Sequence, residues 1–280
     1  MIPQSGAQAL RPVIPHRGRR LCAEVRIMTQ NERRRYLISY LLAERQDRSK
    51  LPFDENTQKR LLRSLLNVRM PKEASNEFLQ LQNEYLQEEI KTKGITDHRR
   101  IVPIQKDICV WQGDITTLRI DAIVNAANSQ MLGCFQPCHN CIDNAIHTFA
   151  GVQLRLICND IMQQQGHEEE TGRAKITPAF NLPSRYVIHT VGPVVQGELT
   201  ENDCRLLKEC YLSCLNLAVE NELQSIAFCC ISTGVFGFPQ HEAAKIAVST
   251  VKQFQKQHKI KVVFNVFKDE DLKIYRELLL

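Results

Sequence analysis

The chain has 280 residues, of which 43% are hydrophobic and 24% are charged. That length allows one large domain or two smaller ones, each able to bury a core. The richest apolar run, residues 226–231, is only six residues long, whereas a membrane span needs roughly 18. The composition therefore predicts a globular protein with no membrane-spanning helix.

The charge is unevenly distributed along the chain. Residues 1–104 contain 20 Lys+Arg against 12 Asp+Glu, and residues 105–280 contain 16 against 19, within a net charge of +5. A basic region can attract a nucleic acid or an acidic protein. Acidic residues are interspersed from Glu24 onward, however, and no nucleic-acid motif accompanies the charge. A solvated helical surface is the favoured interpretation, and nucleic acid is not an expected partner.

The 11 cysteines do not predict a disulfide scaffold. Their number is odd, we recognise no secretory signal, and Cys229 and Cys230 are neighbours in a strand-like run. Cysteine acting as a small core residue in a reducing compartment explains most of them. We therefore expect a cytoplasmic protein.

The first 27 residues are expected to form a disordered leader. Residues 1–23 hold several arginines and no acidic residue, as in a transit peptide. Pro3, Pro12 and Pro15 would nevertheless break the amphipathic helix that such a peptide needs. Ordered structure is expected from Met28, because Thr29–Glu32 forms a capping-box pattern that opens a helix.

Residues 28–100 read as a helical extension. Apolar residues recur at helical spacing within residues 29–93, and prolines at 52 and 71 separate the segments. Gly94 follows the last segment as a C-cap. Because each segment has one apolar stripe, we expect the helices to pack together or against the next domain.

From residue 101 to 280 short β-rich runs alternate with helical ones. The expected strands are 109–112, 122–124, 175–177, 186–190, 226–231 and 262–267, and the expected helices are 143–165, 204–221, 241–258 and 270–279. This alternation predicts an α/β sandwich around a mostly parallel sheet. Ligands of such folds bind beyond the carboxyl ends of the strands, where four polar or glycine-rich segments follow strands: QGDIT, NAAN, HTVGP and STGVFGF. The last precedes a helix, and such a loop can present N–H groups to a phosphate.

The segment between the second strand and its helix contains Cys134, Cys138, His139 and Cys141 within eight residues. Thiolates and imidazoles are ligands that zinc prefers. Ordinary structural zinc modules add a second ligand pair far along the chain, and we find none with that spacing. The position beside the strand-end segments predicts a metal within a ligand pocket.

QGDIT, DAIVNAANS, HTVGP and STGVFGFP, in this order, resemble the macrodomain family over residues 108–280. The resemblance implies a three-layer α/β/α sandwich that binds ADP-ribose at the sheet's carboxyl edge, and some members hydrolyse it from proteins. It implies these roles: Asp114 and Ile115 at the adenine, Asn125 and Asn128 at the distal ribose, Ser232, Thr233, Gly234, Val235 and Phe236 around the diphosphate, and Phe267 beside the adenine. Core packing is the alternative for Phe267.

After NAANS the chain departs from the common macrodomain and resembles the zinc-dependent members, which have an N-terminal helical extension and a Cys-x4-His-x-Cys signature. Cys134, His139 and Cys141 match that signature, and Cys138 does not. The resemblance implies one Zn²⁺ per chain. Because microbial members are associated with a sirtuin-type ADP-ribosyltransferase and its lipoyl-carrier target, it also implies an ADP-ribosylated protein as partner.

Three protein ligands leave the fourth position of zinc free, as in catalytic sites. A fourth ligand, Cys138, would close the site and make it structural, but its adjacency to His139 demands a sharp kink. A site without metal stays open as a third possibility. A redox pair of Cys138 and Cys141 is disfavoured, because thioredoxin-type motifs have no histidine ligand between the cysteines.

Asp143 is the candidate catalytic residue, placed to orient a ribose hydroxyl or the attacking water. Its alternative role is a helix N-terminal carboxylate that favours the macrodipole. We expect His147 and His189 to be structural. The favoured function is a zinc-dependent hydrolase that removes mono-ADP-ribose from acidic side chains, with the extension as a lid or docking surface. The alternative is a reader that binds ADP-ribose without turnover.

Overall fold

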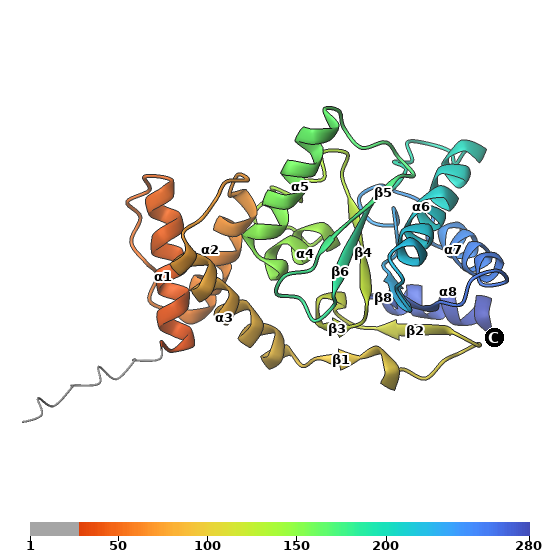
Figure 1. The fold of residues 1–280 in the computed structure, drawn as a ribbon, viewed down its shortest axis with the longest axis horizontal. Helices are drawn as coiled ribbons and strands as arrows, with labels where there is room; N and C mark the ends of the chain where they lie inside the picture. Colours follow the sequence, from red (N-terminus) through yellow and green to blue (C-terminus); the bar gives the residue numbers. More distant parts are fainter. Residues whose placement is uncertain (1–27) are drawn as a thin grey trace, which may run out of the picture.

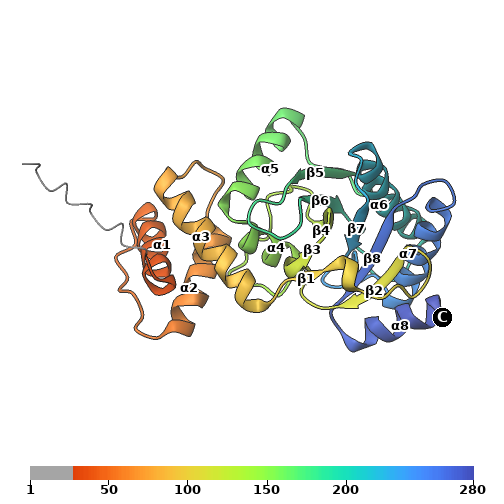
Figure 2. The same ribbon diagram turned by 60° about the horizontal axis from the view of Figure 1, so that its bottom comes forward.

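The computed structural model describes residues 28–280, so the predicted leader at residues 1–27 lies outside the described residues. Within this part, every helix is too short or too polar to cross a membrane. Figures 1 and 2 show a group of helices at one end of the molecule and an α/β domain at the other.

The extension consists of α1 (Gln30–Glu44), α2 (Glu55–Val68) and α3 (Asn76–Lys93). Each helix is preceded by a residue whose side-chain oxygen accepts a hydrogen bond from a backbone N–H of the first turn. These residues are Thr29, Asp54 and Ser75. The capping box of Thr29 with Glu32 and the glycine cap at the end of α3 are both confirmed. The apolar stripes of the three helices pack on one another and form a core of their own.

The α/β domain contains a six-stranded sheet in the order β2-β8-β7-β4-β6-β5. The strands are β2 (Ile108–Gln112), β4 (Ala122–Ala127), β5 (Ala174–Pro178), β6 (Tyr186–Val191), β7 (Ser225–Phe228) and β8 (Lys261–Val266). All neighbours are parallel except the edge pair β5–β6. A separate two-stranded pair that the sequence did not predict joins β1 (Thr96–Asp97) to β3 (Leu118–Arg119).

Helices cover both faces of the sheet. α4 (Ile142–Ala150) and α5 (Val152–Gln165) lie on one face, and α6 (Glu201–Glu220), α7 (Gln240–Phe254) and α8 (Asp269–Leu279) lie on the other (Figure 1). Short 3₁₀ helices η1 (His98–Arg100) and η2 (Ile115–Thr117) complete the domain. The predicted three-layer sandwich with a mixed, mostly parallel sheet is therefore confirmed.

Several predicted boundaries differ from the structure. The helix expected at 241–258 ends at Phe254, and the helix expected at 204–221 begins at Glu201. The helix expected at 143–165 is broken at Gly151, whose φ of +98° lies outside the helical range. A side chain is excluded at this position, because a Cβ would lie 2.6 Å from the Gln82 side chain of the extension. The strand expected at 226–231 ends at Phe228, so the following residues belong to a loop.

Polar contacts hold the extension against the α/β domain. Asn67 Nδ2 donates to Thr148 Oγ1 across 2.9 Å, and Gln82 Oε1 accepts from the N–H of Val152. Ile90 of α3 is buried in the core of the α/β domain. α2 and α3 therefore lie directly beside α4, where the cysteine cluster leads into the helix.

Candidate ligand cleft and metal centre

The carboxyl ends of five parallel strands meet at one edge of the sheet, which brings together the segments that the sequence analysis selected. The N–H of Gly113 donates to the Val266 carbonyl, so the segment after β2 lies beside the end of β8. The N–H of Val195 donates to the Phe236 carbonyl across 2.8 Å and joins the segments after β6 and β7. One continuous rim results, as expected for a ligand cleft.

Asp114 begins η2 at this rim. Its Oδ1 accepts hydrogen bonds from the N–H and hydroxyl of Thr116, and its Oδ2 lies 2.9 Å from Lys93 Nζ of the extension. Burial opposes ionisation, but the hydrogen bond from Thr116 and the Lys93 ammonium together hold the pKa of Asp114 below its usual value. Ile115 beside it is fully buried. Asp114 is therefore an ionised acceptor at the rim.

Phe267 follows β8 on the same rim, and its side chain is 78% exposed. Core packing, the alternative for this residue, is therefore wrong. An exposed aromatic ring beside the Asp114 segment is available to stack on a flat apolar group such as a nucleobase.

The loop after β7 is built to present backbone N–H groups. Ser232 has φ +64°. The Ser232 hydroxyl lies so close to Gly192 that a Cβ on this glycine would clash with it, so the segments after β6 and β7 are in close contact. Thr233 Oγ1 donates to the Cys230 carbonyl and fixes the turn. Across residues 28–280, the N–H groups of Gly234, Val235 and Phe236 find no acceptor. Three free donors on an exposed turn form a site suited to an anion.

Asn125 and Asp143 form a buried pair behind the rim. Asn125 Nδ2 donates to Asp143 Oδ1 across 2.8 Å and lies 3.1 Å from His189 Nδ1. Burial raises the pKa of Asp143 to about 6, although the hydrogen bond from Asn125 opposes the shift. Asn125 Oδ1 is buried and has no partner among the described residues. A buried amide oxygen without a donor is costly and marks a place where a ligand hydroxyl would bind.

Asn128 stands further along the same strand end. Its side chain donates to the Gly133 carbonyl and accepts from the N–H of Gln130. These bonds fix the start of the segment from Gly133 to Cys141, here called the Cys-rich loop.

Three side chains of the Cys-rich loop converge. The ligand atoms of Cys134, His139 and Cys141 all lie within 4.8 Å of one another, with Cys134 Sγ 3.6 Å from His139 Nδ1. Burial and the neighbouring Cys134 raise the pKa of the Cys141 thiol. Two sulfurs and one imidazole nitrogen, partly exposed and this close, suit zinc in number and type.

Cys138 is turned away from this group. Its backbone has φ +54°, its N–H donates to Asn67 Oδ1, and its sulfur lies 3.4 Å from the Arg60 carbonyl of α2. Cys138 and His139 could bind one ion only if the backbone between them were sharply kinked. In the structure their side chains point in different directions, toward α2 and toward Cys134. Cys138 anchors the loop to the extension instead.

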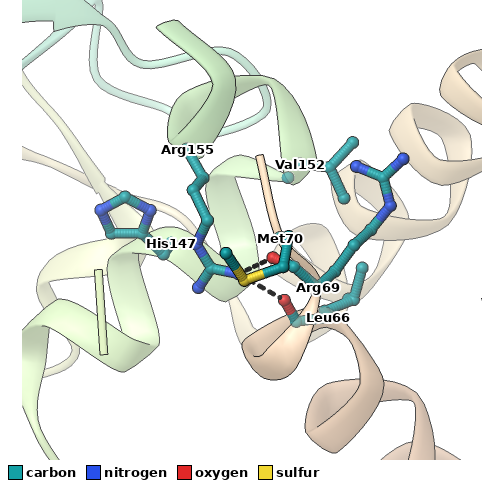
Figure 3. Close-up of a pocket in the computed structure, with 7 residues that line it drawn as sticks. Leu66, Arg69, Met70, His147, Val152 and Arg155 are labelled. Carbon is teal, nitrogen blue, oxygen red and sulfur yellow. Dashed lines mark hydrogen bonds between the residues drawn. The ribbon is translucent and has the colours of Figure 1, made fainter. Parts of the chain in front are cut away.

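The His147 ring packs against the backbone of the Cys-rich loop. A Cβ on Gly133 would lie 2.7 Å from the His147 ring, so the loop backbone packs directly on the imidazole. Both ring nitrogens are buried without a hydrogen-bond partner among residues 28–280, although Nε2 lies 3.5 Å from Asp143 Oδ1. A cavity of about 10 Å³ lies beside the ring, close to the size of one water. Figure 3 shows His147 and Arg155 lining this cavity with residues of the extension.

Arg155 and Arg63 are positioning residues that the sequence analysis missed. Arg155 donates to the carbonyls of Leu66 and Arg69 at the end of α2 (Figure 3) and to Leu132 just before the Cys-rich loop. Arg63 donates to the His139 carbonyl and to Asn144 Oδ1. In the sequence, the only feature that could have identified Arg155 as a positioning residue was a positive charge next to the apolar positions of its helix.

The fold and this rim define a class: an α/β/α domain whose polar and glycine-rich segments meet at the carboxyl edge of a mostly parallel sheet. The Macro domain model matches residues 124–247. A Treponema medium protein named Protein-ADP-ribose hydrolase is 59% identical over 260 residues, covering 90% of this chain and 100% of the relative. A Staphylococcus aureus protein of the same name is 50% identical and covers 90% of this chain and 96% of the relative. The chain belongs to the macrodomain family.

Solved structures agree with this assignment. The Oceanobacillus iheyensis macrodomain with ADP has a TM-score of 0.57 and 40% identity, over 61% of this chain and 89% of that one. The Trypanosoma brucei macrodomain in complex with ADP-ribose has a TM-score of 0.61 and 29% identity, over 78% of this chain and 95% of that one.

Proposed function

We propose that this protein is a zinc-dependent hydrolase that removes mono-ADP-ribose from an acidic side chain of a modified protein. The observation that carries the proposal is the convergence of Cys134, His139 and Cys141 on the loop that follows the Asn125 strand. The relatives named Protein-ADP-ribose hydrolase support the activity.

The residues of the rim would bind the nucleotide part of the substrate. Asp114 would accept a hydrogen bond from the adenine amino group, Ile115 would line the base, and Phe267 would flank it. The free N–H groups of Gly234, Val235 and Phe236 would hold the diphosphate, with Ser232 and Thr233 shaping the turn. This binding far from the reacting bond would fix the ribose C1″ atom in place and lower the entropic part of the barrier.

Asn125 and Asn128 would border the distal ribose. The unpartnered Oδ1 of Asn125 would accept from a ribose hydroxyl, and Asp143 would hold the Asn125 amide in the orientation this requires. Because Asp143 Oδ1 accepts the hydrogen bond from the Asn125 amide, we assign its role in turnover to positioning Asn125.

Cys134, His139 and Cys141 would hold the Zn²⁺. When bound, zinc would act as a Lewis acid that stabilises negative charge developing on an oxygen at the reacting centre. The overall reaction breaks the bond between C1″ and the carboxylate oxygen: the water oxygen bonds to C1″, the carboxylate leaves, and one proton is released. A carboxylate leaves readily, so an ester to Asp or Glu is the favoured substrate over an N-linked arginine.

The acceptor and the location are proposed from the family resemblance and from the state of the cysteines. Resemblance to the microbial zinc-dependent members makes a lipoyl-carrier protein modified by a sirtuin-type transferase the first acceptor to test. Among the described residues, five buried free cysteines suit a reducing compartment, namely Cys109, Cys158, Cys210, Cys214 and Cys229. We propose a cytoplasmic location on that basis.

The test is release of ADP-ribose from a protein modified on glutamate, with and without a chelator. Loss of release with chelator, and its return with added Zn²⁺, is expected. Release that a chelator leaves unchanged would contradict the role of zinc. Tight ADP-ribose binding without any release would favour the reader function instead. A substrate modified on arginine should be cleaved far more slowly.

A further inference from the structure

A groove with a volume of about 460 Å³ separates the extension from the α/β domain beside the Cys-rich loop. α2 and α3 form one wall, and the Cys-rich loop with the end of α4 forms the other. The floor is apolar and consists of leucines of α2 and α3 with Phe149 of α4. The rim candidates for nucleotide binding, Asp114 and the loop after β7, are not among its lining residues.

The charges of this groove are unbalanced. Lys59, Arg60, Arg63 and Glu89 line it. Lys59 Nζ is already paired with Glu55 and Glu89, at 3.0 and 3.6 Å. Within residues 28–280, neither Arg60 nor Arg63 has a carboxylate at salt-bridge distance, and the Arg60 side chain is exposed. Two guanidinium groups therefore remain uncompensated beside an apolar floor.

The groove is joined to the candidate metal centre. Cys138 and Asn140, the neighbours of the candidate ligand His139, both line it. Arg63 donates to the His139 carbonyl across 2.9 Å, and Cys138 Sγ contacts the Arg60 carbonyl. A polypeptide attached to the ribose at the metal centre therefore has this groove immediately beside its point of attachment.

We propose that the groove binds the acceptor polypeptide of the substrate, at a segment with carboxylates next to an apolar side chain. This inference rests on the proposed function, because it assumes that ADP-ribose is attached to a protein when it enters the cleft. Guanidinium groups bind carboxylates through paired hydrogen bonds, and the volume is enough for a few side chains. A nucleic acid fits the groove less well, because Glu89 and the apolar floor break up its positively charged surface.

The test uses two synthetic peptides, each with mono-ADP-ribose on one glutamate. One has aspartates on both sides of the modified residue, and the other has asparagines at the same positions. The variant is Arg60→Glu, because the Arg60 side chain makes no hydrogen bond or ion pair within the part of the chain that the structure describes. Arg48→Glu is the matched control: it has the same charge change in the same extension, on an exposed residue outside the groove.

The wild-type enzyme should have a KM about tenfold lower for the aspartate peptide at low salt, with kcat similar for both peptides. Arg60→Glu should abolish this preference, and Arg48→Glu should keep it. An ADP-ribose 1″-ester of acetic acid, which lacks a polypeptide, should be cleaved equally by all three proteins.

Equal KM values for the two peptides in the wild type would overturn the proposal, as would equal losses in Arg60→Glu and Arg48→Glu. Competition by single-stranded RNA that disappears in Arg60→Glu, without a peptide preference, would assign the groove to nucleic acid. Failure of the wild type to cleave the acetyl ester and both peptides would instead show that the proposed function is wrong.

Discussion

Asn125 Nδ2 donates to Asp143 Oδ1 across 2.8 Å, and both side chains are buried behind the rim of the cleft. The bond joins a strand end to the first turn of α4, directly after the Cys-rich loop. It leaves Asn125 Oδ1 as a fixed acceptor without a partner among the described residues. The orientation of the amide is therefore set by the carboxylate.

Asp143→Ala should lower kcat by about a hundredfold, because the Asn125 amide loses the group that orients it. Asp143→Asn, whose side-chain oxygen can still accept from Asn125, should retain most of the activity. ADP-ribose affinity, measured by calorimetry, should fall in Asp143→Ala, because Asn125 Oδ1 is no longer held toward the ribose hydroxyl, and should change little in Asp143→Asn. If Asp143→Asn is as inactive as Asp143→Ala, the charge itself acts on the reaction and positioning is insufficient.

Substitution of Cys134, His139 or Cys141 by alanine should remove zinc and activity together, because each supplies one of three converging ligand atoms. Cys138→Ser should remove neither, since its sulfur faces α2. Metal content by mass spectrometry and turnover on the same samples check this. A zinc-free Cys138→Ser protein would show that the ligand set is wrong.

Asp114→Ala should weaken ADP-ribose binding about tenfold, as expected for the loss of one hydrogen bond to a charged acceptor. Asp121→Ala is the control, because that residue lies at the opposite edge of the sheet, where it accepts from Gln224 and Ser225. Asp121→Ala should reduce stability and leave the affinity of the folded protein unchanged. Unchanged affinity in Asp114→Ala would place the adenine elsewhere.

Gly133→Ala should destabilise the Cys-rich loop more than its positive φ alone requires. Gly133 and Gly166 have nearly equal φ values, +78° and +77°, but only a Cβ on Gly133 would meet another group, the His147 ring. Gly166→Ala should cost about 1 kcal/mol, and Gly133→Ala about 1–3 kcal/mol more. Urea unfolding of both variants measures the difference, and equal costs would mean that His147 gives way freely.

Stability should fall as the pH drops below about 6.5, with His189 as one cause. Burial lowers the pKa of His189 to about 3. At pH values between about 3 and 6.5, the unfolded chain therefore binds a proton at this histidine that the folded chain does not bind. One such histidine contributes up to about 1.4 kcal/mol of lost stability per pH unit, and nothing above its unfolded pKa. His189→Gln should show a shallower fall in urea unfolding from pH 7.5 to 5. An unchanged slope would exclude His189 as a source.

Local patterns fixed much of this protein in advance. The capping residues of the extension, the alternation of strands and helices, and the order of the strand-end segments could be read from the sequence because they depend on neighbours in the chain. The grouping of Cys134, His139 and Cys141 could also be anticipated, since eight residues leave little room for the ligands to separate.

Contacts between distant segments had to come from the tertiary structure. The break of the predicted helix falls at Gly151, and the Gln82 side chain that leaves no room for a Cβ there comes from some 70 residues away. The burial of Asp143 against Asn125, the support of the loop by His147 and Arg155, and the groove at Arg60 all arise where separate elements meet. Packing geometry between elements is not encoded in spacing along the chain, so a sequence can nominate these side chains without deciding which way they face.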